Sequence, residues 1–186
     1  MELTARDIIL IIIGEGEGRI QGKTNIQKKV YFVGQLLDWD LGYKPHYYGP
    51  YSPLIENALG DLRGLGFVNE SLMGFGMIDQ FGFESRRYDY VLTEDGKSYL
   101  ERIKKTKISD YGKIKGVLDK IKNAGNPDYF TLSIAAKVIH ILSEEKKPLT
   151  QSEIIGEAKK FAWKIPDDKL KEAVSFLNKM ELAETK

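Results

Sequence analysis

Hydrophobic residues between positions 53 and 65 recur every three or four residues, which predicts an amphipathic helix. Ser52 followed by Pro53 is a favourable helix start. The serine hydroxyl can accept a hydrogen bond from a free amide of the first turn, and proline has no amide to satisfy there. Gly66 is expected to end the helix. Its apolar stripe consists of Ile55, Leu59, Leu62 and Leu65.

A β-hairpin and a further helix are predicted after this segment. Residues 67–73 are rich in apolar side chains and residues 74–82 contain several glycines. Along residues 86–92, Tyr88, Tyr90 and Leu92 alternate with other residues as in a half-buried strand. Thr93 is expected to cap a helix over residues 94–105, in which Gly96 costs roughly 1 kcal/mol relative to alanine.

Two more helices are predicted near the N-terminus. Thr4 and Asp7 have the spacing of a capping box, which favours a helix over residues 4–13. This helix is apolar on nearly every side, so it is either fully buried or shared with a second subunit. Thr24 can cap a second helix that ends near Asp38, and the glycines between the two helices would form a flexible turn.

The chain beyond residue 105 is helical by pattern. Helices are predicted over residues 108–122, 131–142, 150–163 and 166–180, and Thr150 and Glu153 have the spacing of a second capping box. The last three helices form a second helix-turn-helix that lacks a wing. We therefore expect an α+β fold, mostly α with a small antiparallel β-hairpin. Residues 1–105 would form an N-terminal winged helix-turn-helix domain, and residues 106–186 an all-helical domain suited to dimerisation.

Two groups of residues resemble known families. Residues 90–96 (Tyr-Val-Leu-Thr-Glu-Asp-Gly), followed by Tyr99 and Leu100, resemble the exit from the wing in PadR-type and MarR-type winged-helix regulators. Gly18-Arg19, Lys23-Thr24, residues 26–28 and the Tyr-Tyr-Gly-Pro-Tyr-Ser string at 47–52 are similar to winged-helix proteins related to YwgA and, more distantly, to SocA-type antitoxin domains. Together these matches cover about residues 1–105. The resemblance implies a winged helix and leaves the molecular function undefined.

The composition argues against several classes of protein. The chain has 186 residues, of which 42% are hydrophobic, as is usual for a globular protein. Its longest apolar run, residues 8–13, is far shorter than the ~20 residues that span a bilayer, so we expect a cytoplasmic protein without membrane contact. It has no cysteine, and its two histidines, His46 and His140, are distant in sequence. We therefore expect no disulfide, no metal site and no cofactor.

The net charge is only +1, but the charge is unevenly distributed. Residues 97–122 contain nine basic and three acidic side chains. This segment is either a solvated pair of helix faces or a strip that contacts phosphates.

The glycine-rich segment over residues 14–24 is similar to a phosphate-binding loop, but its spacing is wrong. Such a loop requires a glycine where this chain has Glu17, and a carboxylate there would repel a phosphate. No cluster supplies a nucleophile or an acid and base pair either, so we expect no enzymatic activity.

The interpretation we favour is a homodimeric, DNA-binding transcriptional regulator that contacts double-stranded DNA. The helix over residues 53–65 would enter the major groove, and Arg86 and Arg87 would contact the flanking backbone from the wing. Glu56 and Asp61 make the outer face of this helix unfavourable for DNA. The expected DNA contacts are Arg19, Lys23, Lys28, Lys29, Ser52, Asn57, Arg63, Arg86 and Arg87.

The alternative is a protein-interaction module, antitoxin-like or an adaptor, built on the same fold. Its partner would contact the acidic helix face or the tyrosine-rich segment over residues 40–51. That segment could also stack bases or line a ligand pocket, although such a loop more often simply packs over the core. The residues expected to contact a partner or ligand are Tyr43, His46, Tyr47, Tyr48 and Tyr51.

Overall fold

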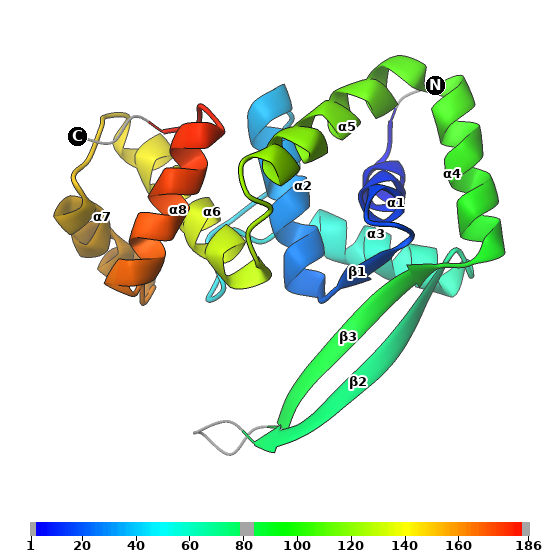
Figure 1. The fold of residues 1–186 in the computed structure, drawn as a ribbon, viewed down its shortest axis with the longest axis horizontal. Coiled ribbons are helices and arrows are strands. Elements are labelled where there is room, and N and C mark those ends of the chain that lie inside the picture. Colours follow the sequence, from blue (N-terminus) through cyan, green and yellow to red (C-terminus); the bar gives the residue numbers. More distant parts are fainter. Residues whose placement is uncertain (1–2, 79–83, 184–186) are drawn as a thin grey trace.

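The computed structural model describes residues 3–78 and 84–183, and of residues 73–78 and 84–87 it describes the backbone alone. Helices predominate, with one small antiparallel sheet (Figure 1). This confirms the predicted α+β class. The elements in chain order are α1 (Ala5–Glu15), β1 (Arg19–Gln21), α2 (Lys23–Leu37), α3 (Pro53–Gly64), β2 (Val68–Ile78), β3 (Glu84–Leu92), α4 (Glu94–Thr106), α5 (Ile108–Asn123), α6 (Tyr129–Glu145), α7 (Gln151–Ala158), the 3₁₀ helix η1 (Lys159–Phe161) and α8 (Asp167–Lys179).

The sheet has the strand order β1-β3-β2, with both pairs antiparallel. Val68 lies opposite Leu92 at the base of the predicted hairpin, and the β2–β3 ribbon projects away from the helices (Figure 1). Strand β1 was not predicted, because we expected residues 14–24 to be a flexible turn. Ile20 pairs with Tyr90 and is buried, so contacts with β3 turn this short glycine-flanked segment into a strand.

The predicted helix starts are confirmed at four of five positions. The hydroxyl of Ser52 accepts from the amide of Ile55, and that of Thr93 accepts from the amide of Gly96. Capping boxes form at Thr4 and at Thr150. The prediction that Thr24 caps α2 was wrong: α2 begins at Lys23, and its N-cap is Gly22, which has a φ of 79° and no side chain to offer.

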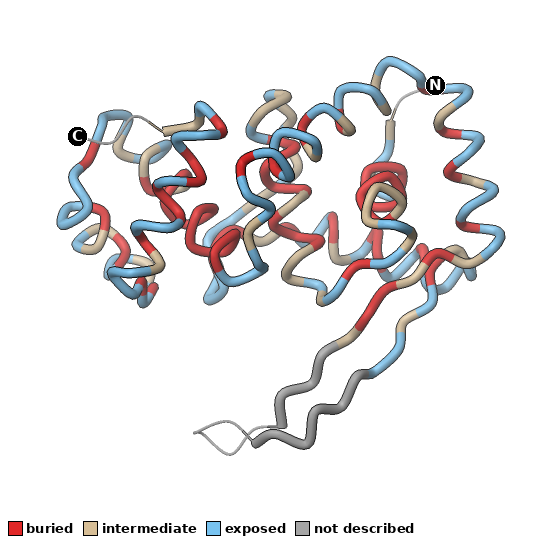
Figure 2. Tube along the Cα trace, in the orientation of Figure 1, coloured by how far each residue is buried: buried red, intermediate tan, exposed pale blue. Residues whose placement is uncertain are grey.

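Helix α1 is the centre of the core. Its residues 8–13 are at most 2% exposed within a single chain (Figure 2). Of the two alternatives for this helix, full burial is therefore the one observed. Helices α2, α3, α4 and α5 all pack against it, as does β3.

The helices after residue 106 pack on the first part of the chain. Helix α5 contacts α1, α2 and α4, and α6 contacts α2 on one side and α7 and α8 on another. The ring of Phe32 in α2 meets that of Phe176 in α8 edge to face, with centroids 5.5 Å apart. Buried residues from Ile8 to Met180 form one continuous cluster. None of the helices within the described ranges has the length and apolarity needed to cross a bilayer.

Candidate functional site

Helix α3 presents the outer face that its sequence pattern predicts. Ile55, Ala58, Leu59 and Leu62 are buried, and Ser52 fixes the N-terminal end. The prediction that Leu65 belongs to the buried stripe was wrong: this residue is the C-cap of α3, just past the last helical turn, and is 57% exposed. The side chains of Asn57, Asp61 and Arg63 are exposed, and Glu56 is half-buried. Helix α3 packs against α1, α2 and β2. This face is therefore open to a partner.

Three of the cations predicted to contact DNA are held by carboxylates of the same chain. The Nζ of Lys23 lies 2.7 Å from Glu56, Arg63 pairs with Glu70, and Arg19 pairs with Asp89. Each cation is about half exposed, whereas Asp89 is fully buried. Because exposed ion pairs contribute only about 0.2–1 kcal/mol, Lys23 can be transferred to a phosphate at low cost. Arg63 and Arg19 can be transferred less easily, since the side chain of Glu70 is only 13% exposed and that of Asp89 is fully buried.

Two of the predicted DNA contacts are not available at the surface. Ser52 is 0% exposed, and its hydroxyl donates to the carbonyl of Leu41 at 2.6 Å in addition to capping α3. Lys28, expected on the outside of its helix, is 1% exposed, and its Nζ donates to the carbonyl of Pro50 at 2.6 Å. The loop before α3 folds back over this lysine, which the helical pattern of α2 alone cannot indicate.

The remaining predicted contacts are placed less decisively. Lys29 is half-buried, and burial lowers the pKa of its ammonium. Arg86 and Arg87 lie in β3, opposite Gly74 and Met73. Their side chains are outside the described part of the structure, so the expected wing contacts stay predictions.

The tyrosine-rich segment divides into a buried and an exposed part. Tyr43 packs against the ring of Tyr31 and its hydroxyl donates to the carbonyl of Gln27 at 2.6 Å; burial raises its pKa well above the usual value. Tyr47 and Tyr48 are 69% and 61% exposed and pack edge to face. The ring of His46 lies 5.0 Å from that of Tyr51.

The basic segment over residues 97–122 is largely neutralised by its own neighbours. Most of its lysines form ion pairs with carboxylates, so the structure favours a solvated helix face over a strip for phosphates. The pairs are Lys97–Glu94, Lys104–Glu101, Lys107–Asp7, Lys113–Asp110, Lys115–Asp119 and Lys120–Glu181.

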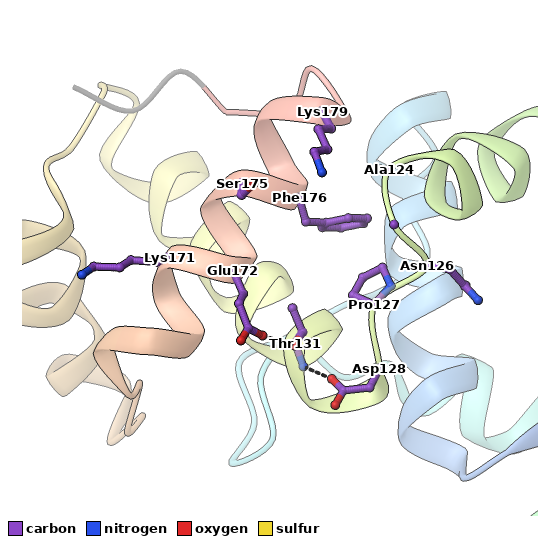
Figure 3. A pocket seen from close by; sticks show the side chains of 11 residues that line it. Ala124, Asn126, Pro127, Asp128, Thr131, Lys171, Glu172, Ser175, Phe176 and Lys179 are labelled. Atoms are coloured by element: carbon purple, nitrogen blue, oxygen red, sulfur yellow. Dashed lines mark hydrogen bonds between the residues drawn. The ribbon is translucent and has the colours of Figure 1, made fainter.

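An open depression of about 660 Å³ lies between the α5–α6 turn and α8 (Figure 3). Its polar groups serve the fold: Asp128 caps α6 through the amide of Thr131, whose hydroxyl donates to Glu172. Phe176 forms part of its wall. Within the described ranges no group of three histidine, cysteine, aspartate or glutamate side chains is placed to hold a metal ion.

Comparison with known proteins gives one distant similarity. The chain is 27% identical over 139 residues to the uncharacterized protein YwgA of Bacillus subtilis (strain 168). The alignment covers 74% of this chain and 77% of that protein. No protein-family model matches the chain. Since 139 residues exceed the length of either predicted domain, the similarity to YwgA extends over parts of both.

Proposed function

We propose that this protein is a winged-helix DNA-binding regulator that acts by binding alone. The observation that carries the proposal is the order α1-β1-α2-α3-β2-β3 combined with the strand order β1-β3-β2. This order places α3, whose outer face is exposed, next to the base of a projecting two-stranded ribbon (Figure 1). A helix-turn-helix protein uses such a helix in the major groove and its wing on the backbone.

The polar chemistry of α3 supports weak sequence preference and a modest electrostatic contribution. Asn57 can bond an adenine edge, and Arg63 can bond guanine or a phosphate. Lys23 at the start of α2 adds a second exchangeable cation. Asp61 on the same face repels the DNA backbone.

The test is binding of the purified protein to a labelled random-sequence duplex at about 50 and 200 mM salt. With about three phosphate contacts, the affinity should fall about 40-fold between the two conditions. Arg63→Ala should weaken binding, and Asp61→Asn should strengthen it by removing a repulsive charge. Lys147→Ala, a change of the same charge on the exposed α6–α7 connection, serves as the control and should have no effect. An affinity that is independent of salt would contradict the proposal.

A protein partner is the second candidate, because the cations beside α3 are already paired and apolar side chains are exposed nearby. Leu54 at the start of α3 is 50% exposed, and Tyr47 and Tyr48 precede it in the same connection. Asp61→Asn separates the two functions. It should weaken a complex that uses the acidic face and strengthen one with DNA.

A further inference from the structure

A cavity of about 300 Å³ lies between the start of α2 and the loop that precedes α3. No residue of α3 lines it, and the DNA-binding proposal shares only Lys23 with it. Residues of α2 form one wall and the loop forms the other. The lining residues are Lys23, Thr24, Gln27, Lys28, His46, Tyr48, Gly49 and Tyr51.

Lys28 is a buried cation without a carboxylate. It is 1% exposed and forms no ion pair with any described residue. Burial, together with the nearby charge of Lys137, lowers its pKa to about 7. A buried charge is normally compensated by a carboxylate of the protein, and no carboxylate in the described part of the chain compensates this one.

Lys137 of α6 adds a second buried cation in the same place. It is 8% exposed, and a Cβ atom at Gly49 would lie 3.0 Å from its Cγ, so it packs directly beneath the loop. Its ammonium lies 5.7 Å from the ring centroid of Trp163, and burial lowers its pKa as well. Two buried lysines therefore meet under one loop with no described acidic side chain bonded to either.

The hydrogen-bonding capacity of Lys28 is also incompletely used. An ammonium has three N–H donors, and among the described residues Lys28 bonds only the carbonyl of Pro50. The side-chain amide of Gln27, in contrast, donates to the carbonyl of Ser52 and accepts from its amide. Lys28 lines the cavity, so its remaining N–H donors can bond a ligand there.

We propose that this cavity binds the phosphate group of a small phosphomonoester, with the ammonium of Lys28 as its principal contact. Lys23 and the first turn of α2, whose N-cap Gly22 offers no side-chain acceptor, add positive potential at the same wall. Lys23 is shared with Glu56, which does not line this cavity.

The rim of the cavity favours a ligand with a flat organic part. The rings of His46 and Tyr51 are inclined at 32° with centroids 5.0 Å apart, and Tyr48 stands beside them, 61% exposed. The loop that carries these rings is held in place by Trp163, whose Nε1 donates to the carbonyl of His46 at 2.6 Å. Because the binding surface is pre-formed, little ordering would oppose binding.

The test is calorimetric titration of the full chain, without DNA, with inorganic phosphate, AMP and acetate at constant ionic strength. Phosphate and AMP should bind, AMP more tightly, and acetate should bind more weakly than either. Lys28→Met should weaken binding of phosphate and AMP by about tenfold or more, since charge-assisted hydrogen bonds are the strongest in such sites. This variant should fold at least as well as the wild type, because it removes a buried charge.

Lys29→Met is the matched control. It changes the adjacent lysine of α2, which does not line the cavity, and should leave phosphate binding unchanged. His46→Ala provides a second variant at the exposed rim: it should weaken AMP more than inorganic phosphate. The proposal is overturned if neither phosphate nor AMP binds the wild type, or if Lys28→Met binds both as the wild type does. Because DNA is absent, these outcomes are independent of the proposed function.

Discussion

Gly96 shows how a close backbone contact reverses an expectation from helix propensity. A Cβ atom at this position would lie 2.1 Å from the carbonyl oxygen of Phe67, a backbone atom that cannot move aside. Gly96→Ala should therefore destabilise the protein by about 1–3 kcal/mol, as overpacked substitutions do, although alanine is the better helix former.

The matched control is Gly112→Ala in α5, where no atom lies within 4 Å of the added Cβ. That substitution should stabilise the protein by about 0.5–1 kcal/mol. Denaturant unfolding of the two variants measures both changes. A Gly96→Ala protein as stable as the wild type would show that the Phe67–Gly96 approach is looser than described.

Lys28 should give the protein a stability that rises with pH. Its folded pKa of about 7 lies below the unfolded value of about 10.4, so the unfolded chain binds more protons between these values. The destabilising effect is complete below about pH 7 and is relieved as the pH rises, by at most about 3–5 kcal/mol. The measurement is the free energy of unfolding between about pH 6 and pH 9, where tyrosines of ordinary pKa stay mostly protonated.

Lys28→Met is the comparison for this pH dependence. It should reduce the rise between about pH 7 and pH 9, leaving the part due to Lys29 and Lys137, whose pKa values burial also lowers, and the variant should exceed the wild type in stability most clearly at the acidic end. Equal slopes in the two proteins would mean that Lys28 keeps an ordinary pKa in the folded state.

At the scale of elements, one buried ion pair ties α1 to the junction of α4 and α5. The Nζ of Lys107 lies 2.7 Å from Asp7, and the two side chains are 7% and 1% exposed. Burial alone would raise the pKa of Asp7, but hydrogen bonds from Lys107 and Thr4 outweigh it and hold the pKa below the usual value. Asp7 therefore contributes stability that is present above its unfolded pKa and is lost as the pH falls through the folded value.

Lys107→Met should destabilise the protein by about 3–5 kcal/mol, because it leaves the carboxylate of Asp7 buried without its cation. Acid unfolding should also begin at a higher pH, since burial then dominates the pKa of Asp7. Lys104→Met breaks the exposed pair with Glu101 on α4 and should cost less than about 1 kcal/mol. If the two variants lose the same stability, the buried pair has no special role.

The elements that the sequence predicts correctly are those specified by neighbouring residues. Ser52, Thr93 and Thr150 sit within three positions of the amides they cap, so spacing alone locates these helix starts. Strand β1 and the burial of Lys28 depend on partners about 70 and 22 residues away, β3 and Pro50. A single sequence without knowledge of the tertiary arrangement contains no local signal for either. The carboxylates that pair with Arg19 and Arg63 are also distant in sequence or on another element, so the sequence pattern does not indicate these ion pairs.

At the scale of the whole molecule, the contacts across α2 and α6 indicate that both halves of the chain unfold together. Phe32 meets Phe176 across this boundary, and Trp163 bonds the carbonyl of His46 in the loop before α3. The buried cluster is continuous from Ile8 to Met180. Cooperative unfolding is expected where one core spans the chain.

The two tryptophans lie on opposite sides of this boundary, and so they can report on the halves separately. Trp163→Phe leaves Trp39 as the fluorophore of the first half, and Trp39→Phe leaves Trp163 as that of the second. In each variant, the denaturant midpoint by fluorescence should coincide with the midpoint by far-UV circular dichroism, which follows all helices at once. Trp163→Phe should also lower the stability by about 1–2 kcal/mol, because the carbonyl of His46 loses its donor. If the midpoint reported by Trp39 lies below the midpoint by circular dichroism and that reported by Trp163 lies above it, or the reverse, residues 1–105 and 106–186 unfold as independent units.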